Sequence, residues 1–107
     1  MKITIDSQIN IEGIDISHHN GVPQWEKVKK QTQFIIIKAS QGATFKDPKF
    51  FLNWKEAKRN KIIRGAYHFF DPCCTASEQF SNFKNSVKLS TGDLPPVLDV
   101  ELKECDI

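Results

Sequence analysis

The 107-residue sequence lacks the features that mark several classes of protein. It has no apolar run long enough to span a membrane, and residues 1–6 lack the apolar core of a signal peptide. Its three cysteines, Cys73, Cys74 and Cys105, cannot complete a framework of paired disulfides, and their spacing matches no zinc motif. We therefore expect no membrane span, metal site or redox centre, and we interpret Cys73 and Cys74 as small, buried or half-buried residues.

An excess of charge of one sign is also missing. The chain has 15 Lys and Arg against 13 Asp and Glu, a net charge of +2, and its basic residues are scattered rather than grouped. Scattered lysines usually form a solvated surface, so nucleic acid is not an expected partner. The phosphate-binding patterns GxGxxG and GxxxxGK do not occur, which argues against a nucleotide site.

The composition that remains is that of one globular domain. The sequence is 39% hydrophobic and 26% charged, values typical of a folded, soluble chain. A chain of this length has room for a real but modest core and not for a second domain. We therefore expect residues 1–107 to form a single domain.

Hydrophobic patterning predicts strands and helices in alternation after an irregular polar segment at residues 1–9. Short runs rich in β-branched and aromatic residues predict four strands. These runs are residues 11–17, 34–37, 62–70 and 95–101. Apolar residues at helical intervals predict three helices between the strands. The helices are residues 25–32, 48–60 and 76–89.

The second and third helices carry recognisable start signals. Asp47 is expected to cap the second helix, with Pro48 at its first position, and the apolar stripe of that helix is Phe51, Trp54 and Ala57, with Phe50 beside them. Residues 75–78 have the spacing of a capping box at the start of the third helix. The apolar stripe of that helix comprises Phe80, Phe83 and Val87.

The β-α-β-α-β-α-β order predicts an α/β fold of parallel β/α units joined by right-handed crossovers. Four such strands suit either an open doubly wound sheet or the first half of a (β/α)₈ barrel. In both folds the functional residues lie at the carboxyl ends of the strands. The polar residues at those ends are Asp15, Lys38, Gln41, Tyr67, His68, Asp99 and Glu101.

The fourth predicted strand brings two carboxylates to one side. Side chains alternate along a strand, so Asp99 and Glu101 share a face, with Cα atoms about 6.5–7 Å apart. Each negative charge raises the cost of ionising the other, and one carboxyl can therefore stay protonated at neutral pH.

Each of these residues also has a structural interpretation. Asp15 can cap the loop that follows it, and the two later acids can form ion pairs with Lys38 or Arg64. Tyr67 and His68 are adjacent on a strand, so only one of them can face a site. His68 is expected to be a hydrogen-bonded core residue.

The loop after the first predicted strand contains a histidine pair. We interpret His18 and His19 as exposed loop residues rather than metal ligands, because no third ligand is evident nearby.

Four segments together resemble the family 25 glycoside hydrolases, which are N-acetylmuramidase lysozymes. These segments are GIDISHHNG at residues 13–21, FIIIKASQG at 34–42, GAYHF at 65–69 and PVLDVE at 96–101. The resemblance implies a barrel of eight strands with fewer than eight helices. It also implies cleavage of the β-1,4 bond between N-acetylmuramic acid and N-acetylglucosamine in peptidoglycan, with no cofactor.

The resemblance also implies roles for individual residues. Glu101 matches the catalytic acid, Asp99 its acidic partner, and Asp15 the carboxylate of the first strand. Tyr67 and Lys38 match positions that line the sugar groove. Gln41 stands where many relatives carry glutamate, so its expected contribution to substrate binding is hydrogen bonding.

The chain is shorter than such a barrel requires, so we expect residues 1–107 to be a partial domain containing its first four strands. A half barrel leaves the first and fourth strands with open edges. We expect a missing second half or self-association to cover them, and a groove open on that side.

Three functional hypotheses follow. The first is a peptidoglycan hydrolase acting outside the cell or at the cell wall, a location inferred from the substrate. The second is a noncatalytic peptidoglycan-binding module, inactive because the second half is absent. The third is an α/β domain whose acids bind Mg²⁺ for phosphoryl chemistry, which the missing phosphate motifs disfavour.

Overall fold

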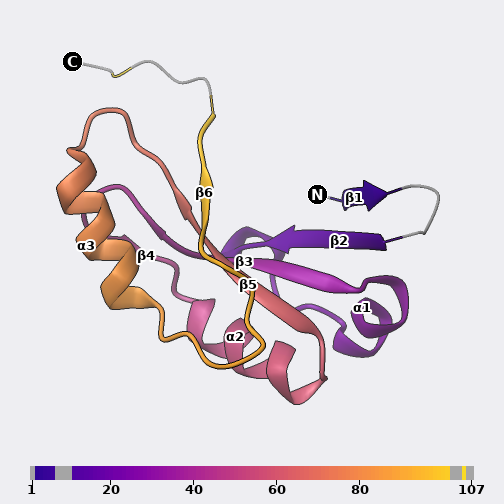
Figure 1. Ribbon diagram of the computed structural model, residues 1–107. Coiled ribbons are helices and arrows are strands. Elements are labelled where there is room, and N and C mark those ends of the chain that lie inside the picture. The colour runs from indigo at the N-terminus through magenta and orange to yellow at the C-terminus, as the bar shows by residue number, and fades with distance from the viewer. Residues whose placement is uncertain (1, 7–10, 102–104, 106–107) are drawn as a thin grey trace.

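The computed structural model describes residues 2–6, 11–101 and 105 and contains a mixed six-stranded sheet (Figure 1). The strand order is β1-β2-β3-β5-β6, and β4 pairs with β3 to one side. The strands are β1 (Lys2–Asp6), β2 (Ile11–Ile16), β3 (Phe34–Gln41), β4 (Phe45–Lys46), β5 (Ile63–Phe69) and β6 (Val97–Asp99). The helices are a 3₁₀ turn (His18–Asn20), α1 (Trp25–Gln31), α2 (Phe50–Arg59) and α3 (Ala76–Ser86).

The predicted parallel β/α units are present. β2, β3, β5 and β6 are parallel neighbours, and one α-helix lies between each successive pair along the chain. The antiparallel strands β1 and β4 were not predicted, and they make the sheet mixed. In the described part of the chain, none of the helices is long and apolar enough to cross a membrane.

The prediction of irregular structure at residues 1–9 is wrong for residues 2–6. β1 pairs antiparallel with β2, placing Ile3 opposite Gly13. This pairing satisfies backbone groups that β2 would otherwise leave unpaired at the sheet edge. The predicted open edge of the first parallel strand is therefore also wrong, while residues 1 and 7–9 lie outside the described residues.

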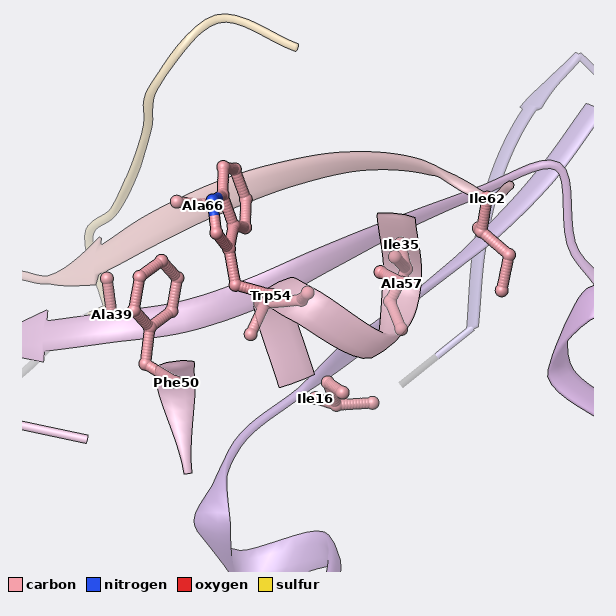
Figure 2. Close-up of a cluster of buried hydrophobic side chains, with 9 residues drawn as sticks. Ile16, Ile35, Ala39, Phe50, Trp54, Ala57, Ile62 and Ala66 are labelled. Carbon is pink, nitrogen blue, oxygen red and sulfur yellow. The ribbon is translucent and has the colours of Figure 1, made fainter. Parts of the chain in front are cut away.

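All three α-helices contribute side chains to the core on one face of the sheet. Ile35 and Ile37 of β3 are fully buried there, and α2 contributes most of the large side chains that cover them. Figure 2 shows the rings of Phe50 and Trp54 extending from α2 toward Ala39 and Ala66. The small residues on the strands leave room for these rings, so the core on this face is continuous.

The predicted start and stripe of α2 need correction. The N-cap is Lys49, and Asp47 instead accepts a 2.8 Å hydrogen bond from the Lys49 backbone N–H, so the helix begins at Phe50. Phe51 is 79% exposed, and the buried face contains Asn53 in addition to the three other predicted residues. The helix start sets which residues face the sheet, and the two adjacent phenylalanines cannot both do so.

α3 begins as predicted but buries different residues. Thr75 is the N-cap, and its hydroxyl accepts from the Glu78 N–H and donates to the Glu78 carboxylate. Phe80 is 67% exposed, so its predicted place in the apolar stripe is wrong. The buried residues of this helix are the amides Gln79 and Asn82.

An ion pair fixes the approach to β6. Arg64 of β5 donates from Nε to Asp93 Oδ1 at 2.8 Å, and both side chains are over 90% buried. The guanidinium also lies 3.8 Å from the Trp54 ring centroid and donates to the Trp54 carbonyl oxygen. Burial alone would raise the pKa of Asp93, but hydrogen bonds from Arg64 and Ser90 hold it below its ordinary value.

Cys73 and Cys105 form a disulfide with Cα atoms 5.1 Å apart, and Cys74 is a free, half-buried thiol. The interpretation of Cys73 and Cys74 as small, buried or half-buried residues is therefore wrong for Cys73, which is exposed and pairs with a cysteine 32 positions away in sequence. The bond ties the chain after β6 to the loop between β5 and α3.

We predict that Asp93→Ala lowers the free energy of unfolding by about 3 kcal/mol, because it leaves the buried Arg64 charge without its partner. Glu56→Ala is the control, since it removes a pair with the largely exposed Arg59 and is expected to cost less than about 1 kcal/mol. Urea unfolding of both variants measures the difference, and equal losses would contradict the prediction.

The same carboxyl predicts a pH dependence. The folded pKa of Asp93 lies below its unfolded value, so its stabilisation is present above the unfolded value and is lost as the pH falls through the folded one. Asp93→Asn should therefore lose less stability than the parent protein on acidification in that range, as measured by urea unfolding at a series of pH values.

We predict that Cys73→Ser lowers the free energy of unfolding by roughly 2–4 kcal/mol, because the disulfide restricts the unfolded chain. Cys74→Ser serves as the matched control and should change stability little, since Cys74 is unpaired. Urea unfolding under non-reducing conditions provides the measurement. If the two variants unfold at the same midpoint, the disulfide does not contribute as proposed.

Candidate active site

The sheet face opposite the helices contains an open groove of about 770 Å³. Six of the seven polar residues predicted at the strand ends line it. They are Asp15, Lys38, Gln41, Tyr67, Asp99 and Glu101. His68 does not line the groove, and further lining residues that the sequence did not single out include Phe69 and Val97.

Strand register explains why these side chains converge. Residues that pair across neighbouring parallel strands point to the same face of a sheet. Three successive rows of paired residues line the groove: Asp15 and Ile36; Lys38, Tyr67 and Val97; and Gln41, Phe69 and Asp99. The acids of β2 and β6 thus lie at opposite sides of one groove.

A bulge in β3 turns Gln41 into the groove. Lys38 and Gln41 are three residues apart and would face opposite sides of a regular strand. The β3–β5 ladder slips between Lys38 and Ser40, leaving Ala39 without a partner on β5. The extra residue returns Gln41 to the side of Lys38, whose Nζ donates to Gln41 Oε1 at 2.6 Å.

Lys38 lies in a largely enclosed setting. Only 6% of the residue is exposed, and its Nζ lies 5.3 Å from the ring centroids of both Phe45 and Phe69. Burial lowers the pKa of Lys38, while the charges of Asp47 and Asp99 act in the opposite direction. Neither phenylalanine was predicted to contribute, although Phe69 alternates with Tyr67 on the same strand.

Tyr67 faces the groove and His68 faces the helices. This agrees with the prediction that only one of these adjacent residues can face a site. Burial raises the pKa of Tyr67 well above its ordinary range, and the carboxylates of Asp15 and Asp99, in that order, add to the shift. Its phenol therefore stays protonated and can donate a hydrogen bond. His68 is 1% exposed and bonded on both ring nitrogens, which confirms its predicted core role.

Asp99 and Glu101 lie at the end of the sheet. Asp99 is the last residue of β6, and its backbone carbonyl accepts from Phe70 N at 2.9 Å. The predicted strand end at residue 101 is wrong, because Glu101 is exposed and lies beyond β6. The alternative ion pair with Arg64 is also wrong, since Arg64 pairs with Asp93.

Asp47 is a buried acid near the groove that sequence reasoning treated only as a helix cap. Its side chain is fully buried and accepts from the backbone N–H of His18 and from His18 Nδ1, both at 2.9 Å. His18 is therefore half-buried rather than exposed, whereas His19 is exposed and lines the groove. In the part of the chain that the structure describes, no group of three or more His, Cys, Asp or Glu side chains could hold a metal ion.

Comparison with known proteins identifies relatives over most of the chain. Residues 14–106 match Glycosyl hydrolases family 25. The chain is 41% identical over 105 residues to the uncharacterized protein YegX of Escherichia coli strain K12, covering 92% of this chain and 39% of that protein. It is 36% identical over 96 residues to Lysozyme M1 of Streptomyces globisporus, covering 85% of this chain and 33% of that protein.

Solved structures of similar fold also cover most of the chain. A family 25 glycosyl hydrolase from Bacillus anthracis superposes with a TM-score of 0.86 and 33% identity, covering 92% of this chain and 46% of that one. The chain thus spans less than half the length of each of these relatives.

We predict that Tyr67 resists ionisation in the folded protein. It is the only tyrosine, so the ultraviolet absorbance of tyrosinate reports on it alone. Folded protein should show little tyrosinate at pH values where the urea-unfolded chain titrates, near the ordinary pKa of about 10. Because the folded pKa of Tyr67 is raised, this residue stabilises the folded protein below its unfolded pKa, and that stabilisation is lost as the pH rises through the folded pKa.

The titration also tests whether the acids face Tyr67. Asp15→Asn and Asp99→Asn should each move its pKa back toward the ordinary value, because each removes a negative charge near the phenol. Glu26→Gln on α1 is the control, since Glu26 is exposed and does not line the groove. Equal titration of all three variants would contradict the arrangement.

Proposed function

The chain belongs to glycosyl hydrolase family 25, and we propose that it acts on peptidoglycan as a muramidase. The bond cleaved would be the β-1,4 link between N-acetylmuramic acid and N-acetylglucosamine. The observation that carries this proposal is the convergence of Asp15, Asp99 and Glu101 on one open groove together with Tyr67 and Lys38. Such a protein would act outside the cell or at the cell wall, where its substrate lies.

We further propose that residues 1–107 are a single partial domain, the first half of a TIM-like barrel. Four parallel strands with intervening helices support this assignment, as does the chain's coverage of 46% of the Bacillus anthracis structure. Among the described residues, β6 pairs only with β5. Its other edge would pair with the remaining half of the family fold or with a second copy.

Glu101 is proposed as the general acid. Hydrolysis breaks the bond between the anomeric carbon and the leaving oxygen, and a protonated carboxyl transfers its proton to that oxygen. Water then adds to the anomeric carbon as hydroxide, and the remaining proton returns to the Glu101 carboxylate. The position of Glu101 on the groove beyond β6 is compatible with this contact.

Asp99 and Asp15 are proposed to stabilise the positive charge that develops at the anomeric carbon. The N-acetyl carbonyl oxygen of the substrate can also serve as an internal nucleophile, a recognised exception to the scheme with two protein carboxylates. In that case Asp99 would orient the amide. Asp99 is half-buried and held by the β5–β6 ladder, a placement suited to orienting a group.

The remaining groove residues are proposed to bind the sugars. Tyr67 can donate a hydrogen bond or stack on a ring, since its phenol stays protonated. Lys38 can attract the muramyl carboxylate as a point charge, and Gln41 can hydrogen-bond to a sugar while holding the Lys38 ammonium.

The second candidate is a noncatalytic peptidoglycan-binding module. The observation that favours it is length, because the chain covers only 39% of YegX and 33% of Lysozyme M1. On this candidate, groove residues in the part of the relatives that this chain does not cover would be needed for hydrolysis, whereas the residues present here would still bind peptidoglycan.

We predict that the protein releases reducing ends from purified cell walls, with or without a metal chelator. Glu101→Gln should reduce the release by at least about 100-fold, because the amide cannot donate the catalytic proton. Glu26→Gln is the matched control, since it makes the same change at an exposed site away from the groove. Unchanged release by Glu101→Gln would refute the assignment of the acid.

A pulldown on insoluble peptidoglycan separates the two candidates. Binding without release of reducing ends supports the noncatalytic module and excludes the hydrolase for this chain. Neither binding nor release contradicts both.

A further inference from the structure

We propose that Gln79 and Asn82 of α3 are positioning residues for the groove. They hold the β3 bulge and the β3–β4 hairpin, so that Lys38 and Gln41 face the proposed substrate together. The proposal rests on the proposed function only for its binding readout. Its structural readout is independent of any glycan.

The first observation is what α3 buries. Gln79 and Asn82 are 3% and 6% exposed, although the neighbouring Phe80 is 67% exposed. Burying an amide is unfavourable unless its polar atoms are hydrogen-bonded. The packing of α3, which exposes Phe80 and buries two amides, therefore depends on the hydrogen bonds that those amides make.

Gln79 uses both ends of its amide. Its Nε2 donates to the carbonyl oxygens of Asp71 at 2.7 Å and Cys74 at 3.1 Å, which fixes the orientation of the group. Its Oε1 accepts from Asp71 N at 2.9 Å and lies 2.9 Å from His68 Nε2. Because Oε1 can only accept, His68 must carry a proton on Nε2.

The other ring nitrogen of His68 extends the network to the bulge. Its Nδ1 atom lies 2.7 Å from the Ser40 hydroxyl, which can donate to it or accept from it. Ser40 is fully buried and is the first residue of β3 that pairs with β5 after the bulge. The chain of hydrogen bonds therefore runs from α3 through β5 to the residue next to Gln41.

Asn82 holds the hairpin that follows. Its Nδ2 donates to the carbonyl oxygens of Gly42 at 3.0 Å and Phe45 at 3.1 Å, with a longer contact of 3.4 Å to that of Gln41. Its Oδ1 accepts from Lys46 Nζ at 2.8 Å. One side chain thus contacts both strands of the hairpin.

These anchors matter because β3 could slip by one residue. A slip of one position turns every side chain of a strand to the other face. It would move Gln41 away from the groove and remove its 2.6 Å bond to Lys38. Movement of the hairpin would also displace Phe45, whose ring lies beside the Lys38 ammonium.

The test compares Asn82→Asp with Asn85→Asp. Both make the same change on α3, but Asn85 is exposed and has no contact with the hairpin among the hydrogen bonds of the described residues. The carboxylate introduced by Asn82→Asp would keep an acceptor for Lys46 and lose the donors to the carbonyl oxygens. We expect trinitrobenzenesulfonate to label Lys38, mapped by mass spectrometry, about tenfold faster in Asn82→Asp only, equivalent to about 1.4 kcal/mol.

Two further variants separate positioning from general destabilisation. Val28→Ala destabilises the fold by removing core packing from α1, which does not line the groove, and should leave Lys38 labelling unchanged in the folded protein. Lys46→Met removes one anchor from Asn82 and should raise labelling less than Asn82→Asp. It replaces Asn82→Asp as the decisive variant if circular dichroism shows that Asn82→Asp does not fold.

The binding arm uses a soluble tetrasaccharide of alternating N-acetylglucosamine and N-acetylmuramic acid. Asn82→Asp should bind it about tenfold more weakly than Asn85→Asp, in line with the labelling. Unchanged labelling of Lys38 in the decisive variant overturns the positioning role whatever the glycan result. Increased labelling in a protein that binds no glycan supports the positioning role and counts against the proposed function.

Discussion

The slip in the β3–β5 ladder at Ala39 is the constraint on which the groove depends. Before it, β3 alternates regularly between the helix face, with Ile35 and Ile37, and the groove face, with Lys38. After it, the alternation is shifted by one residue, so Gln41 joins Lys38 instead of facing the helices. Because Ala39 has no partner on β5, Gln41 lies beside Lys38 and the two form a hydrogen-bonded pair. The irregular backbone of β3 must then be held by hydrogen bonds from the helix side of the sheet.

The two sides of the groove differ in how firmly the sheet holds them. Asp15 and Lys38 belong to strands with neighbours on both sides, whereas Asp99 ends a three-residue strand and Glu101 lies beyond it. The Arg64–Asp93 pair precedes that strand and the Cys73–Cys105 bond follows it. The proposed general acid therefore lies beyond the sheet, between two tethers.

Local pattern predicted the order of the parallel strands and helices, and the rule that polar residues gather at strand ends predicted six groove residues. The errors have a common physical cause, which is that partners distant in sequence decided them. Phe51 and Phe80 satisfy helical spacing, but packing selected Phe50 and the buried amides of α3 instead. The bulge that places Gln41, and the pairing of β1 with β2, depend on backbone contacts that periodicity does not encode.

The electrostatics of the groove follow from these placements. Lys38 donates a hydrogen bond to the neutral amide of Gln41, and its ammonium lies beside two aromatic rings. Asp15, Asp99 and Glu101 lie on the same surface, with Tyr67 exposed to the fields of all three. The groove thus carries charge of both signs. On the proposed assignment, this arrangement would let a glycan that carries a carboxylate meet Lys38 while its glycosidic bond lies against the acids.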